Sequence, residues 1–223
     1  MKILVIAPHP DDEVLGCGGT IKKYTKRGDD VFLCIVTCAY TPDWSEDFIK
    51  NRKKEISCAT KNLGIKKIIF LDLPTVKLDT IPQKQLNDLI SKCVQEINSD
   101  ILFIPFYGDI NKDHKLVSEA ALVAVRPKPK LSTKKVYYYE VLSETEWAKP
   151  AQRIEDVFIP NFYEDIFDSL GDKLKAMECY KSELKNYPHP RSLRGIKVLA
   201  QKRGIECGVK AAEAFMLLRE VVK

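Results

Sequence analysis

Short apolar runs recur along this chain, separated by longer stretches in which apolar residues return every three or four positions. Short runs bounded by proline, glycine or charged residues are typical of β-strands. We expect strands at residues 2–7, 30–37, 67–71, 101–105 and 136–141. The first run, residues 3–6, is apolar at every position, which is typical of a strand buried in a parallel sheet.

The stretches between these runs have the spacing of amphipathic helices. Helices are expected near residues 19–26, 45–63, 82–97, 115–125 and 168–183. A last helical block is expected over 194–202 and 209–222, interrupted around Gly204. The alternation predicts a single α/β domain over residues 1–223, with a Rossmann-like, mainly parallel sheet and helices on both faces.

Titratable side chains are concentrated where the first strand is expected to end. Residues 7–13 read Ala-Pro-His-Pro-Asp-Asp-Glu and follow the apolar run directly. Ligand sites in open α/β sheets form beyond the carboxyl ends of strands. His9 and Asp12 offer a nitrogen and an oxygen ligand, which suits zinc, and Asp11 lies between them. A simpler interpretation is a solvated loop in which Asp11 or Asp12 caps a helix that begins near Val14.

A second loop of the same kind follows the strand expected at 101–105. It contains Asp109, Asn111, Asp113 and His114, and a helical pattern comes next. The chain has three histidines, and two of them occupy these strand-end loops. His9, Asp12 and His114 would form a three-ligand zinc site with an open position, the pattern of a catalytic metal centre.

These segments resemble the LmbE-like, or PIG-L-like, zinc-dependent N-acetylglucosaminyl deacetylases. The resemblance rests on residues 7–13 and 15–20, 52–55 with 63–64, 109–114, 203–204 and 212–215. It implies zinc bound by His9, Asp12 and His114, and hydrolysis of the N-acetyl amide of an N-acetylglucosamine-type sugar. That sugar can be free, oligomeric, phosphorylated or nucleotide-linked. Acetate and the free amine are the products.

The resemblance also assigns roles around the metal. Asp11 is implied to be the general base, and Arg52 matches an arginine that contacts substrate in relatives. Asn111 stands where many members have a histidine. An amide donates a hydrogen bond to an oxyanion but delivers no proton, so the general acid is an open question. Asp11 is one candidate for passing a proton to the amine, and His189, on a proline-flanked loop, is the other.

Three further positions have two interpretations each. Trp44 is expected at the same sheet edge as His9, where it would serve equally as a platform for a sugar or as cover for apolar surface. Arg52 has the alternative of a helix-face ion pair with Glu55. Glu13 would either support a ligating histidine or place a favourable charge in the first turn of a helix. The glycines at 16, 18 and 19 indicate close helix–sheet packing, since the dinucleotide-binding spacing is absent.

Charge and composition limit the classes of partner expected for this chain. The formal net charge of +5 comes from charges spread along the chain, which favours a small-molecule substrate over nucleic acid. No apolar stretch reaches membrane-spanning length. Seven cysteines without a C-x-x-C pair favour free thiols in a reducing cytoplasm. Relatives are often homo-oligomers, and no feature of this sequence decides that state. The alternatives are an amidohydrolase for another N-acyl amine, such as an antibiotic or thiol conjugate, and a non-catalytic sugar- or nucleotide-binding module.

Overall fold

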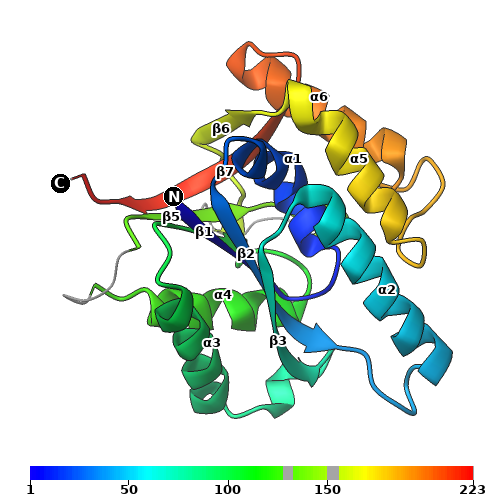
Figure 1. The fold of residues 1–223 in the computed structure, drawn as a ribbon, viewed down its shortest axis with the longest axis vertical. Helices are drawn as coiled ribbons and strands as arrows, with labels where there is room; N and C mark the ends of the chain where they lie inside the picture. Colours follow the sequence, from blue (N-terminus) through cyan, green and yellow to red (C-terminus); the bar gives the residue numbers. More distant parts are fainter. Residues whose placement is uncertain (128–132, 150–155, 223) are drawn as a thin grey trace.

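A seven-stranded sheet in the order β3-β2-β1-β4-β5-β7-β6 forms the centre of the computed structural model (Figure 1). The structure describes residues 1–127, 133–149 and 156–222. Strands β1 to β5 pair in parallel, whereas β7 runs antiparallel to both β5 and β6. The strands are β1 (Lys2–Ala7), β2 (Asp30–Cys38), β3 (Lys67–Pro74), β4 (Ile101–Pro105), β5 (Lys135–Tyr139), β6 (Phe162–Asp165) and β7 (Ala212–Glu220).

Helices cover both faces of this sheet. They are α1 (Asp12–Lys26), α2 (Glu46–Leu63), α3 (Gln83–Ile97), α4 (Lys112–Ala124), α5 (Leu170–Cys179) and α6 (Leu193–Cys207). Figure 1 shows α3 and α4 together on one face and α1, α2, α5 and α6 on the other. Each face has its own apolar core, because the buried strands direct alternate side chains to opposite sides. This arrangement confirms the expected single-domain, Rossmann-like α/β fold.

The C-terminal part of the chain differs from the expected helices. Residues 212–220, within the helix expected over 209–222, form β7, and β6 has no expected counterpart. Apolar residues in β7 are consecutive, a pattern that suits either a helix or a buried strand, and pairing with β5 and β6 decides for the strand. The expected interruption at Gly204 is also wrong, since α6 continues through it. Gly204 is instead a close contact, because a Cβ there would lie 2.6 Å from the Val209 carbonyl oxygen.

Helix α1 begins earlier than expected, at Asp12, and its glycines do pack closely. A Cβ on Gly16 would overlap the Tyr139 ring in β5. Interior backbone groups of α1 also have side-chain partners from distant elements. The amides of Gly19 and Thr20 donate to the two carboxylate oxygens of Glu213 in β7, at 2.8 and 2.7 Å. Lys173 in α5 donates to the Leu15 carbonyl at 2.8 Å and to Glu213 at 2.6 Å, and this ion pair is almost fully buried.

One pair of cysteines contradicts the expectation of free thiols. Cys58 in α2 and Cys179 at the end of α5 form a disulfide across 121 residues of sequence. The two helices pack side by side and bring the Cα atoms to 5.7 Å, within the normal range for a bridge. Cys17, Cys34, Cys38, Cys93 and Cys207 are free.

Within the described residues, no helix combines the length and the apolar character that crossing a bilayer requires.

Candidate active site

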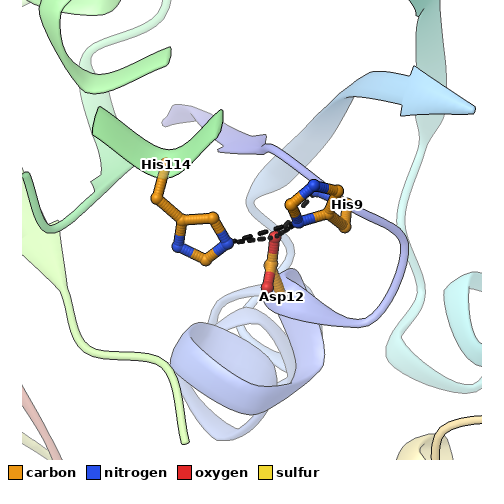
Figure 2. Close-up of side chains that lie close together, drawn as sticks. All are labelled: His9, Asp12 and His114. Carbon is orange, nitrogen blue, oxygen red and sulfur yellow. Dashed lines mark hydrogen bonds and ion pairs between the residues drawn. The ribbon is translucent and has the colours of Figure 1, made fainter. Parts of the chain in front are cut away.

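Three side chains from two neighbouring strand ends converge beyond the carboxyl edge of the sheet. His9 lies on the loop after β1, Asp12 begins α1, and His114 lies in the first turn of α4 (Figure 2). β1 and β4 are adjacent in the sheet, and the chain order reverses between them, which is where α/β sheets place their ligand sites. The structure therefore brings together the three residues expected to bind a metal.

The facing atoms of this group form a small triangle. His9 Nδ1 lies 3.3 Å from His114 Nε2 and 3.5 Å from Asp12 Oδ2, and His114 Nε2 lies 3.4 Å from the same oxygen. Zinc bonds of about 2.0–2.2 Å in a tetrahedral arrangement place neighbouring ligand atoms about 3.3–3.6 Å apart. The donor set and its spacing fit one small divalent cation.

The other ring nitrogen of each histidine is held by a carboxylate. Asp113 Oδ2 lies 3.0 Å from His9 Nε2, and Asp109 Oδ2 lies 2.7 Å from His114 Nδ1. The two acids are fixed in turn, since Asp113 accepts the backbone N–H of Val76 and Asp109 accepts the Thr145 hydroxyl. Such pairs orient metal-binding imidazoles. Neither acid was expected in this role, although both precede His114 by at most five residues.

The electrostatics of the group favour positive charge. Burial lowers the pKa of His9, but the adjacent Asp113 and Asp12 carboxylates outweigh burial and raise that pKa to about 9. Burial also opposes protonation of His114, yet Asp12 and Asp109 raise its pKa well above the usual value. Carboxylates so placed stabilise any cation between the rings.

Asp11 lies beside the triangle in a strained backbone conformation. Its φ is +111°, its side chain makes no capping hydrogen bond to α1, and it is buried. The Asp11 amide donates to Glu13 at 3.1 Å, and Tyr180 donates to the other oxygen of Glu13 at 2.7 Å. Burial raises the pKa of Asp11 well above its usual value, with the Asp12 charge adding to the effect and Arg191 opposing it. The capping interpretation of Asp11 is therefore wrong.

The hydrogen bonds of Glu13 go to the Asp11 amide and Tyr180 and not to either histidine of the triangle, and Glu13 lies in the first turn of α1, as the second of its two interpretations expects. Its carboxylate holds the Asp11 backbone instead, and burial raises its pKa to about 7.

Asn111 caps the helix that carries His114. Its Oδ1 accepts the backbone N–H of Asp113 at 3.0 Å, and the residue lines the cavity in front of the triangle. Capping occupies the oxygen of this amide, so Nδ2 is the atom that can donate to a ligand.

A cavity of about 240 Å³ opens onto the triangle. We call the side nearest the triangle its polar wall. That wall consists of His9, Asp11, Asp12, Asn111, Glu144 and Arg191. The expected substrate residues Arg52 and Trp44 also line this cavity.

Arg52 and Arg191 are linked through one acid. Arg52 Nη2 and Arg191 Nη1 bind the two oxygens of Glu183, the latter at 3.1 Å. The expected pair of Arg52 with Glu55 is present but longer, at 3.7 Å. Arg191 Nη1 also lies 3.5 Å from Asp11 Oδ2, and Nη2 donates to Glu144 at 2.9 Å. Arg191 was not expected at the site, and its only signal in the sequence is its place two residues after His189.

His189 is not among the residues that line this cavity. Its Nδ1 accepts the Arg191 backbone N–H at 3.1 Å, and its ring packs edge-on against Trp147. The loop thus presents Arg191 to the cavity, and a general-acid role for His189 stays a prediction.

Several known proteins are similar to this chain in sequence and in fold. A probable N-acetyl-alpha-D-glucosaminyl L-malate deacetylase 2 of Bacillus anthracis is 27% identical, over 93% of this chain and 88% of its own. An uncharacterized deacetylase, YaiS, of Escherichia coli K12 is 33% identical, over 81% and 90% respectively. The crystal structure of the conserved protein TT1542 from Thermus thermophilus superposes with a TM-score of 0.77 at 23% identity, covering 99% of this chain and 96% of that one.

The family described as GlcNAc-PI de-N-acetylase, PIG-L, matches residues 4–125. That segment is more than half of the chain and contains His9, Asp11, Asp12, Arg52, Asn111 and His114. The chain belongs to the PIG-L family.

Proposed function

We propose that this protein is a zinc-dependent N-deacetylase of small N-acetylglucosamine-type sugars. It would hydrolyse the N-acetyl amide and release acetate and the free amine. The observation that carries the proposal is the triangle of His9, Asp12 and His114, whose facing atoms lie 3.3–3.5 Å apart. Beside it is the Asp11 carboxylate, which makes no capping bond to α1. Family membership supports the same chemistry, as does the Bacillus anthracis relative, a probable deacetylase of a glucosaminyl malate by its name.

Zinc is the proposed metal, because two imidazole nitrogens and one carboxylate oxygen suit it. Bound there, zinc would polarise the amide carbonyl and lower the pKa of a water molecule. Asp109 and Asp113 would keep the two imidazoles in the tautomer that presents a lone pair to the metal.

Residues of the polar wall would carry out the proton transfers. The Asp11 carboxylate would accept a proton from the attacking water and later pass it to the leaving nitrogen. Glu13 supports this role, because it holds the Asp11 backbone in place. Asn111 would donate from Nδ2 to the developing oxyanion. Asp11 is better placed than His189 to act as the acid, since it lines the cavity.

Arg52 and Trp44, which also line the cavity, would contact the substrate. Glu183 binds the Arg52 guanidinium. Because the arginine side chain is already ordered, it would lose less conformational entropy when substrate binds.

Elemental analysis of purified wild-type protein beside His114→Ala tests the proposal, followed by a screen for acetate release from N-acetylated sugars. We expect about one zinc per wild-type chain, a large loss in the variant and turnover only with metal. Wild-type protein that binds no metal, even after zinc is added back, would contradict the hydrolase.

A further inference from the structure

The carboxylate that holds His9 is itself held by a segment that contributes no candidate ligand. This segment, residues 75–78, follows directly after β3. Val76 donates its backbone N–H to Asp113 Oδ2 at 2.7 Å, and the same oxygen lies 3.0 Å from His9 Nε2. Leu78 donates its backbone N–H to the other oxygen at 3.3 Å. Asp113 is only 2% exposed, so these amides take the place of water as its hydrogen-bond donors.

The backbone of Val76 adopts a conformation that valine rarely takes. Its φ is +59°, in the left-handed region, where a branched side chain is crowded by the backbone. The Val76 side chain is 67% exposed, so side-chain packing does not explain why this conformation is retained. Strained conformations persist where the surrounding structure holds them, and they cluster at functional sites.

The residues on both sides of Val76 are fixed to different parts of the molecule. Thr75 donates its backbone N–H to the Cys38 carbonyl at the end of β2, at 3.1 Å. Leu78 is 1% exposed and belongs to the apolar core on the face of α3 and α4. The chain turns between these two anchors, and its left-handed residue directs the Val76 N–H to Asp113.

We infer that Val76 is a positioning residue for His9, which acts through its backbone N–H and through Asp113. The inference rests on the metal site of the proposed function. The Val76 N–H fixes the Asp113 carboxylate, and that carboxylate accepts a hydrogen bond from His9 Nε2. His9 Nδ1, the atom that faces Asp12 and His114, then keeps its lone pair for the metal. A segment outside both strand-end loops therefore contributes to the metal affinity.

Replacement of the Val76 N–H by an ester oxygen tests this inference. The α-hydroxy acid that corresponds to valine, placed at position 76, retains the side chain and removes the donor. We expect the Kd for zinc, measured by competition with a chelator, to rise about tenfold, within the range typical of groups that orient ligands. The same replacement at Thr80 is the matched control, because the Thr80 amide donates to the Lys77 carbonyl at 3.0 Å. A wild-type Kd in the Val76 ester, or an equal rise in the control, would overturn the inference.

Two further variants separate a role of the backbone from a role of the side chain. Val76→Gly keeps the N–H and adopts a positive φ without strain, so its Kd for zinc should stay within about threefold of wild type. In Asp113→Ala protein the acceptor is absent, so the ester at position 76 should change the Kd by less than about threefold. A loss of about tenfold in Val76→Gly, or full additivity with Asp113→Ala, would contradict a role through Asp113.

Zinc binding and turnover separate this inference from the deacetylase proposal. A raised Kd in the Val76 ester, with no acetate release from zinc-loaded wild type, would sustain the positioning role and refute the deacetylase. Acetate release from wild type, with the same Kd in wild type and in the ester variant, would do the reverse. Wild-type protein that binds no zinc would refute both.

Discussion

The two loops that supply the triangle are built differently. The polar side chains of the β4–α4 loop and of the first turn of α4 are used in hydrogen bonds. Asn111 caps α4, Asp109 binds His114, and Asp113 binds His9. The β1–α1 loop forgoes local capping, because Asp11 has a positive φ and no capping hydrogen bond.

Contacts from elsewhere add to the local bonds of the β1–α1 loop, in which the His9 and Asp11 amides donate to Asp12 and Glu13. Tyr180 supports it through Glu13, and Arg191 lies beside Asp11, so both supports come from the region after α5. The comparison shows that one loop uses its polar groups to fix the two histidines. The other leaves the Asp11 carboxylate without a capping bond, beside Arg191, at the expense of backbone strain.

The largest expected effect on activity comes from changing the β1–α1 loop, with Asp11→Asn. Turnover should fall about 10²–10⁴-fold, because an amide accepts no proton, while zinc content and folding are retained. Steady-state kinetics and elemental analysis on the same preparation measure both. The control is Asp79→Asn, an exposed carboxylate paired with Lys112, which should leave turnover unchanged. A variant with more than a tenth of wild-type activity would refute the assignment of the base.

A smaller effect is expected from the acids of the β4–α4 loop. Asp109→Asn and Asp113→Asn should each weaken zinc binding about 10–100-fold, because an amide orients imidazole less strongly. Asp109→Asn should have the larger effect, since Asp109 is completely buried against His114. Competition with a chelator measures the affinities. Wild-type affinity in both variants would show that these acids do not orient ligands.

The smallest effect concerns the cap of α4. Asn111→Ala should lower the free energy of unfolding by about 1 kcal/mol, whereas Asn111→Asp keeps a capping oxygen and should remain near wild type. Both variants lack the Nδ2 donor, so any loss of activity that they share is separate from the cap. Denaturant titration measures the stabilities, and equal destabilisation by the two changes would argue against the cap.

The sequence alone is sufficient to predict the parallel strands of the sheet and the three residues of the triangle. Residues 3–6 and 101–104 are apolar at every position, so strands β1 and β4 were predictable. His9 is two residues beyond β1, and His114 is in the helix that follows β4. The remainder depends on tertiary packing. The pattern of residues 209–222 suits either a helix or a strand, and only pairing with β5 decides for the strand. The contact of Arg191 with Asp11 and the disulfide between Cys58 and Cys179 join distant parts of the chain, so no local pattern indicates them.

The buried pair of Lys173 and Glu213 ties α1 to the end of the chain. During synthesis, all three candidate ligands leave the ribosome long before the carboxylate that accepts the amides of Gly19 and Thr20. A chain that ends before residue 212 would hold every ligand yet leave two interior amides of α1 without this acceptor. The helix that begins with Asp12 thus receives these two bonds only from the last of the seven strands to be made.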